Sequence, residues 1–199
     1  MRFPMMRRND RELDFFATLD LLDRCHVVRL AMIDGQEPYI VPLNYGYTCE
    51  NGQITLFCHS AKVGRKLDVM RANPLVAFEM DTDYLLQTHE EACHHSNLYS
   101  SVTGTGKFEL LAGERAKSAL TVLMHHQTGR DFSFTDEQIN SVVVFAIHVK
   151  NISGKAKRNY KNLKKSTKRK TASRRSFLFA IPLISSSQRQ KHPASRSAR

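Results

Sequence analysis

The sequence has no tryptophan, few cysteines and no long hydrophobic segment, and these absences exclude several classes of protein. No run approaches the roughly 20 apolar residues that a membrane helix requires. The basic N-terminus is not followed by an apolar segment, so we expect no secretory signal. The four cysteines are scattered without close pairs. This pattern favours reduced thiols in a cytoplasmic protein.

Acidic residues are absent from the last part of the chain, although the whole chain has a net charge of +11. Residues 155–199 contain eight Lys and seven Arg but no Asp or Glu, which leaves 15 basic against 19 acidic residues before them. The preceding part therefore has a net charge of −4 and is mildly acidic. This distribution argues against a nucleic-acid-binding globular domain.

The basic tail lacks hydrophobic periodicity and is rich in Lys, Arg and Ser, which predicts disorder. We therefore divide the chain into an N-terminal arm and helix (1–24), a globular domain (25–155) and the tail (156–199). Three roles remain open for the tail. It is a solvated appendage with weak attraction to polyanions, a segment that binds nucleic acid or a membrane surface, or a product of a shifted reading frame without selected function.

Short apolar runs separated by turn dipeptides predict an antiparallel sheet. We expect six strands, at residues 25–33, 38–47, 53–58, 75–80, 102–111 and 142–149. Asp34-Gly35 and Asn51-Gly52 are typical of two-residue hairpin turns. Helices are expected at residues 61–72, 113–126 and 135–140. Because two-residue turns are too short for parallel crossovers, these strands predict an antiparallel barrel with helical excursions.

Basic residues gather between the third predicted strand and the helix that follows it (FCHSAKVGRKL). Helix N-termini present unpaired N–H groups and therefore favour phosphate. Lys62, Arg65 and Lys66 are unfavourable at the start of an isolated helix, but they suit a bound dianion there. Ser60 adds a hydroxyl donor, and Gly64 permits a close approach of a ligand to the backbone. The alternative is an amphipathic helix with a solvated basic face.

Several correlated segments are more specific than any one of them alone. They are residues 25–32 (CHVVRLAM), 38–47 (PYIVPLNYGY), 57–66 (FCHSAKVGRK), 126–132 (HQTGRDF) and 153–155 (SGK). In these segments, and over residues 7–155, the chain resembles the pyridoxamine-phosphate-oxidase-like flavin-binding split barrels, in particular their Nim branch of 5-nitroimidazole resistance proteins. The resemblance implies a mainly β fold with helices, a six-stranded antiparallel split barrel. It also implies a homodimer with a flavin in each of two clefts between the subunits.

The resemblance further implies which residues hold the flavin, with FMN expected first and FAD as the alternative. Arg65 and Lys66 would bind its phosphate, and a strand edge would run along the isoalloxazine ring. The expected cofactor-binding residues are Pro42, Leu43, Asn44, Tyr45, His59, Ser60, Lys62, Gly64, Arg65, Lys66, Ser101 and Val102. Pro42 within a strand fits an edge turned toward a ligand, although an edge turned toward solvent is the alternative.

His59 is the residue that we expect to be catalytic, because the Nim branch has a histidine at this place that is proposed to act in the active site. A neutral imidazole could donate a hydrogen bond to a substrate oxygen, and an imidazolium could deliver a proton. The alternative is a histidine that caps the helix or contacts the flavin without a proton role.

Two other features are not expected to contribute to the site. His94 and His95 stand beside Cys93, but no second ligand pair follows at zinc-like spacing. We therefore expect loop residues there and no metal site. Ser100 stands where related Nim sequences commonly have arginine. This difference puts in doubt any charge that this strand contributes to flavin or dimer contacts.

The sequence as a whole favours a flavin-dependent oxidoreductase that reduces small electron-poor acceptors such as 5-nitroimidazoles. Pyridoxamine-phosphate oxidase activity is an alternative, but those enzymes bind substrate with a C-terminal segment containing tryptophan and arginines. This chain has no tryptophan. A non-catalytic flavin- or haem-binding protein, with His59 as an axial ligand, is another alternative, although nothing in the sequence selects iron. The last alternative is a protein that binds polyanions through its basic tail. No membrane partner is expected.

Overall fold

The computed structural model describes residues 8–157, so most of the predicted tail, with its expected disorder, lies outside the described residues. The strands are β1 (Val27–Asp34), β2 (Glu37–Asn44), β3 (Gly46–Glu50), β4 (Gln53–Ser60), β5 (Leu75–Gln87), β6 (Ser96–Leu111) and β7 (Val143–Lys157). The helices are α1 (Phe15–Leu22), α2 (Arg65–Ala72), α3 (Gly113–Thr128) and α4 (Asp136–Asn140), with short 3-10 helices at Asn9–Arg11 and Ala92–His94. Within the described range, no helix combines the length and apolar character needed to cross a membrane.

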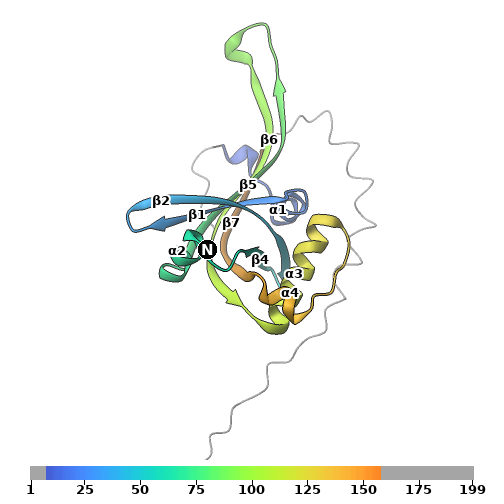
Figure 1. The fold of residues 1–199 in the computed structure, drawn as a ribbon. Coiled ribbons are helices and arrows are strands. Elements are labelled where there is room, and N and C mark those ends of the chain that lie inside the picture. Colours follow the sequence, from blue (N-terminus) through green and yellow to red (C-terminus); the bar gives the residue numbers. More distant parts are fainter. Residues whose placement is uncertain (1–7, 158–199) are drawn as a thin grey trace, which may run out of the picture. The chain divides into compact units, whose positions relative to one another are not determined.

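The seven strands form one antiparallel sheet in the order β2-β1-β5-β6-β7-β4-β3 (Figure 1). β2 and β3 lie at opposite ends of this order, yet only Tyr45 separates them in the chain. The sheet must therefore roll until its two ends meet. The predicted antiparallel split barrel is confirmed. The strand count is seven rather than six because the strand expected over residues 38–47 is divided at Tyr45.

Both predicted two-residue turns are confirmed, since Asp34 pairs with Glu37 and Glu50 pairs with Gln53. The strands β5 and β6 are much longer than expected. They remain paired as far as Gln87 and form a long hairpin that projects beyond the barrel (Figure 1). The extension was missed because most side chains between residues 81 and 99 are exposed or only partly buried, so the sequence shows no apolar alternation there.

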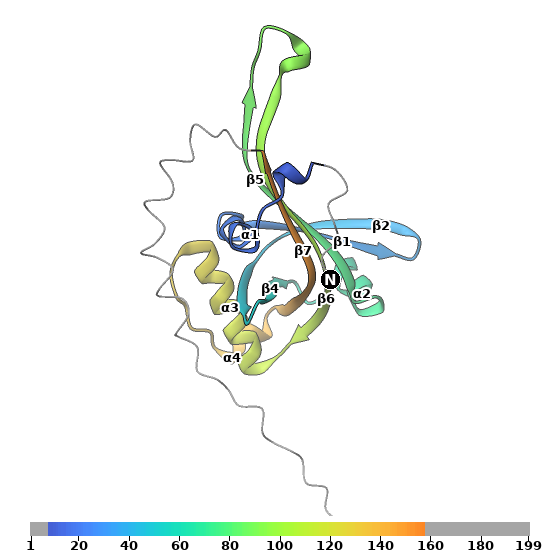
Figure 2. The same cartoon turned by 180° about the vertical axis from the view of Figure 1, so that it is seen from behind.

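The barrel interior is filled by alternate residues of each strand, as the two-residue period of a strand requires. In β4, for example, Ile54, Leu56 and Cys58 are buried while the residues between them face outward. A smaller apolar cluster lies beneath α3 and α4, which pack against the barrel wall (Figure 2). These two helices match the predicted ones. The helix predicted over residues 61–72 begins only at Arg65.

The junction between β2 and β3 is tightly packed. The Tyr45 side chain is fully buried, and its hydroxyl donates a 2.7 Å hydrogen bond to the carbonyl oxygen of Leu22 at the end of α1. Gly46 lies against α3 so closely that a Cβ would be 2.5 Å from the Cα of Leu123. The absence of a side chain at Gly46 therefore lets α3 press on the point where the chain changes from one sheet edge to the other.

We predict that Tyr45→Phe lowers the free energy of unfolding by about 1–2 kcal/mol, because the buried Leu22 carbonyl loses its donor. Thermal or denaturant unfolding measures this loss. Tyr39→Phe is the control, because the hydroxyl of Tyr39 makes no hydrogen bond to any residue between 8 and 157. Equal stability of the two variants would show that the Tyr45 hydrogen bond does not stabilise the junction.

Candidate functional site

The rolled sheet is not closed by hydrogen bonds between β2 and β4. β3 pairs with β4 as far as Gly46 opposite Phe57, and two further residues in this register would set Asn44 opposite His59. However, β2 pairs only with β1, through Asn44 opposite Val27 at this end, and no pairing joins β2 to β4 in the strand order. Residues of β2 and β4 still lie within 8 Å of each other, measured between Cα atoms. The result is a break in the ladder of strand pairing, called the opening below, bordered by two strand edges that are not paired with each other.

His59 and Ser60 form the β4 border of this opening. The His59 side chain faces outward and is exposed at the end of the strand. Partial removal of water lowers the pKa of His59, so the imidazole is neutral near pH 7. Ser60 faces inward, and its hydroxyl donates a 2.9 Å hydrogen bond to the Ala61 carbonyl oxygen. Of these two predicted site residues, His59 is therefore the one presented to a ligand.

The loop between β4 and α2 offers groups that suit an anion. Gly64 has φ 143°, a backbone conformation that other residues rarely adopt, and the space where a Cβ would stand is open. No side chain caps the N-terminus of α2, so the first-turn N–H groups lack that partner. Lys62 and Lys66 form no ion pair with any described residue. Lys62 lies in the loop and not in the first turn of the helix, where the sequence had predicted it.

Arg65 has partners within the chain. Its Nε lies 2.6 Å from an Asp34 carboxylate oxygen, and its Nη2 lies 3.4 Å from a Glu37 carboxylate oxygen. The guanidinium also lies over the ring of Tyr39, 4.6 Å from its centre. These contacts join the start of α2 to the β1–β2 turn, and the hydrogen bond to Asp34 raises the pKa of Arg65. Because exposed ion pairs of this kind are weak, Arg65 can exchange these carboxylates for another anion.

The β2 border consists of residues 42–45. Pro42 and Asn44 are exposed, and Leu43 is half-buried. The Asn44 amide nitrogen lies 3.3 Å from two acceptors, the His26 carbonyl oxygen and the Gln127 side-chain oxygen. Tyr45 has its side chain in the core, so its contacts with any ligand in the opening are limited to the backbone.

The end of α3 holds the β2–β3 junction in place, a role that the sequence did not predict. The Gln127 amide nitrogen donates to the carbonyl oxygens of His26 (3.0 Å) and Tyr45 (2.8 Å). His126 Nε2 lies 2.8 Å from the Cys25 carbonyl oxygen and therefore carries the donating hydrogen. Burial lowers the pKa of His126, which keeps the ring neutral. Only the fold shows this role, because residues 126–127 lie about 80 to 100 positions from their partners in the chain.

Ser101 and Val102 lie apart from the other predicted site residues of the same chain. His59 pairs with Val144 of β7, and Val144 pairs with Leu111 of β6. Ser101 is ten residues further along β6, which is about 33 Å at roughly 3.3 Å per residue. Val102 is fully buried. One chain therefore sets this part of β6 far from His59 and three strands away from Pro42 across the sheet, since Thr103 is level with Pro42 in the register.

Ser100, the predicted departure from related sequences, is fully buried, and its hydroxyl oxygen has no hydrogen-bond partner in the part of the chain that the structure describes. Ser100 therefore contributes no charge to this strand.

A shallow surface depression of about 560 Å³ lies near Ser100, at the base of the projecting hairpin. Its lining residues are Arg11, Asp81, Tyr84, Ser96, Asn97, Tyr99 and Lys157. None of them is a predicted site residue, so this depression is separate from the opening between β2 and β4.

Comparison with known families assigns the chain to one of them. The family described as pyridoxamine 5'-phosphate oxidase matches residues 17–156. This span covers most of the chain, and the protein belongs to this family. No curated protein sequence matches the chain.

Solved structures with the same fold include two that are also related in sequence. A protein from Bacteroides thetaiotaomicron assigned to 5-nitroimidazole antibiotic resistance is 26% identical, with a TM-score of 0.64 over 73% of this chain and 86% of that one. A FAD-binding protein from Mesorhizobium loti is 25% identical, with a TM-score of 0.53 over 74% and 98%. The FAD- and haem-binding protein from Mycobacterium smegmatis, 18% identical with a TM-score of 0.64 over 75% and 74%, shares the fold.

Proposed function

We propose that the protein is a flavin-dependent oxidoreductase that binds FMN or FAD in the opening between β2 and β4. The observation that carries this proposal is the loop of residues 61–66, in which cations and uncapped N–H groups meet at the border of the opening. Membership of the pyridoxamine 5'-phosphate oxidase family and likeness to a FAD-binding protein support it.

The residues of the loop fit a flavin phosphate. Lys62 and Lys66 have no ion-pair partner among residues 8–157, and Gly64 leaves its backbone open to a close approach. The part of the chain before residue 155 has a net charge of −4, so this cluster is a local exception to an acidic surface. Arg65 adds a third cation when it exchanges Asp34 and Glu37 for the phosphate.

The side chains at the opening can serve an electron-transfer reaction. When bound, a flavin supplies hydride or single-electron transfer to an acceptor. The edge of β2 presents backbone groups along the opening, and Pro42 has no N–H to leave unpaired there. The neutral His59 imidazole can donate an N–H to a nitro or carbonyl oxygen. We propose small electron-poor acceptors such as 5-nitroimidazoles, in line with the 26% identity to the nitroimidazole-resistance protein.

We also propose that the flavin lies at the interface of a homodimer. Three large apolar side chains of β1, β2 and β5 are exposed on the outer face of the sheet: Ile33 (50%), Ile40 (62%) and Leu75 (62%). They lie close together, because Ala31 pairs with both Ile40 and Ala77. A second copy would remove this apolar surface from water. It could also bring its own β6 to the opening, from which Ser101 of the same chain is distant.

We predict that Arg65→Ala combined with Lys66→Ala weakens FMN binding roughly 100-fold, because two charge-assisted hydrogen bonds to phosphate are lost. Quenching of flavin fluorescence during titration measures the affinity. Arg115→Ala combined with Lys117→Ala removes an Arg and a Lys near the start of α3, where both form ion pairs within the chain, and should leave affinity unchanged. If the double variant of Arg65 and Lys66 binds FMN as tightly as the wild type, the loop does not bind the phosphate and is only a solvated basic face. A wild-type protein that takes up neither flavin would refute the proposed function.

We predict that His59→Gln lowers the rate of nitroimidazole reduction roughly 100-fold at unchanged flavin occupancy, if the imidazole delivers a proton. Because burial lowers the pKa of His59, its charged form accumulates only at a pH more acidic than a free imidazole requires. The wild-type rate should therefore rise as the medium is made acidic, and the variant rate should not. His148→Gln, at a histidine bound to Glu109, is the control. Equal rates for wild type and His59→Gln would exclude a catalytic role for His59.

We predict that Ile40→Glu converts a wild-type dimer into a monomer and reduces its flavin occupancy, because a charge would be buried in the interface. Analytical ultracentrifugation with flavin absorbance measures both properties. Leu110→Glu places the same charge at a partly exposed leucine of β6 and should remain dimeric. The proposed interface is wrong if the wild type is a monomer with full flavin occupancy.

A further inference from the structure

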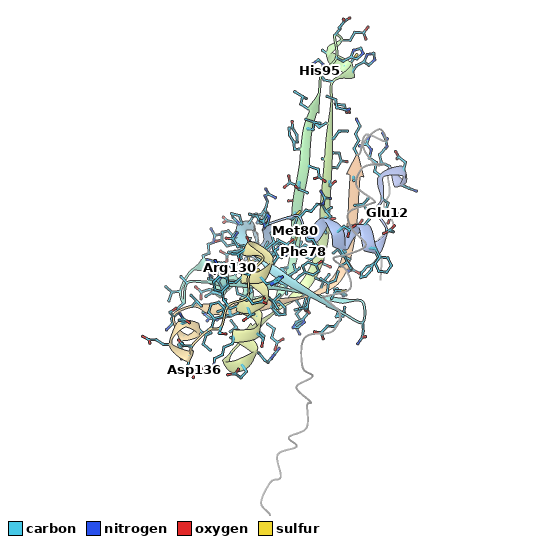
Figure 3. The ribbon with its side chains drawn as sticks, turned by 90° about the vertical axis from the view of Figure 1, so that its right-hand side faces the viewer. Glu12, Phe78, Met80, His95, Arg130 and Asp136 are labelled. Atoms are coloured by element: carbon cyan, nitrogen blue, oxygen red, sulfur yellow. The ribbon has the colours of Figure 1, made fainter. Side chains whose placement is uncertain are left out.

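The tip of the β5–β6 hairpin gathers side chains with metal-ligating groups. Residues 89–95 read HEEACHH and form the turn between the two strands. Figure 3 shows His95 at the far end of the hairpin, among several side chains that cluster there. β5 begins just after α2 and contains 13 residues, so the tip is about 40 Å from α2 along the strand. This cluster is therefore remote from the opening between β2 and β4.

Glu91, Cys93 and His94 place one ligand atom each within 4.8 Å of the others. His94 Nδ1 lies 3.0 Å from a carboxylate oxygen of Glu91, and the Cys93 sulfur lies 4.0 Å from the same oxygen. Tetrahedral zinc with bonds of about 2.0–2.3 Å sets its ligand atoms roughly 3.3–3.7 Å apart. The distances between the three atoms therefore reach tetrahedral values with changes of about 1.5 Å or less, which exposed side chains make by small rotations.

Hydrogen bonds of the turn hold this arrangement. The Glu91 N–H donates to Nδ1 of His89 at 3.2 Å, and Nδ1 of His95 lies 3.3 Å from the Glu91 carbonyl oxygen. The rings of His89 and His94 meet edge to face, with their centres 4.8 Å apart. His95 is not among the residues whose ligand atoms meet within 4.8 Å, so its contact with the Glu91 carbonyl oxygen serves to hold the turn.

We propose that the hairpin tip is a binding site for a borderline divalent transition metal such as Zn²⁺, with Glu91, Cys93 and His94 as ligands. The thiolate and imidazole donors favour such ions over Mg²⁺ and Ca²⁺, which prefer oxygen ligands. On binding, the Cys93 thiol gives its proton to solvent and the thiolate takes the metal. This departs from the sequence prediction of no metal site. That prediction considered only Cys and His, whereas the third ligand is a glutamate two residues before the cysteine.

Titration of the full-length protein with Co²⁺ tests the site, because Co²⁺ stands in for Zn²⁺ and its visible absorption reports tetrahedral coordination. We expect intense bands in the red region, where oxidised flavin does not absorb, saturating at one Co²⁺ per chain. Zn²⁺ should abolish the bands and excess Mg²⁺ should not. The bands report binding independently of flavin and of turnover, so this result does not depend on the proposed function.

Variants assign the ligands. Cys93→Ser and His94→Ala should each weaken Co²⁺ binding at least tenfold with an unchanged melting temperature, since both residues are exposed. Cys49→Ser removes another cysteine that is not fully buried and should bind like the wild type. The proposal is wrong if the wild type gives no tetrahedral bands. It is also wrong if the bands persist in Cys93→Ser or disappear equally in Cys49→Ser.

Discussion

The passage of the chain through Tyr45 is the constraint on which the barrel depends. β2 and β3 are neighbours in sequence but lie at opposite ends of the strand order. The sheet can satisfy both positions only by rolling up, and the roll is fixed by the buried Tyr45 hydroxyl on Leu22 and by the Gln127 amide on the Tyr45 carbonyl. The chain reversal at Tyr45 also separates β2 from β4. The same feature therefore closes the barrel and leaves the opening between these two strands.

An opening between two strand edges is a liability unless something covers it, because unpaired edge groups invite other strands. Here charged and polar side chains stand at its border. Arg65 is held by Asp34 and Glu37 over the ring of Tyr39, while Lys62 and Lys66 have no such partner among the described residues. Since exposed ion pairs are weak, the border can rearrange around a phosphate at small cost. An edge that would otherwise promote aggregation is thereby suited to a ligand.

Much of the fold could be predicted because local chemistry and tertiary structure agree. Dipeptides such as Asn51-Gly52 fix their turns, and alternation marks the buried strands. The division at Tyr45 could not be predicted, since Tyr45 continues an apolar strand pattern. The contacts of Arg65 with the β1–β2 turn could not be predicted either, because they join residues about 30 positions apart in the chain. Of the predicted site, the loop of residues 61–66 has the open glycine and the uncapped helix start that the sequence predicted, and its binding of an anion stays a prediction. The distance between Ser101 and His59 could not be predicted, because it depends on strand register.

The two proposed sites follow one structural rule, although they are distant from each other. Within the described residues the barrel interior is almost wholly apolar, with Ser60 and Ser100 as buried polar exceptions, so it offers little for chemistry. Ligand groups stand instead where strands end, at the loop after β4 and at the turn between β5 and β6. Rigid strands fix the position of such turns, while the turns tolerate changes of sequence that a packed core does not. A barrel built in this way can keep its fold while its loops and strand ends take up different chemistry.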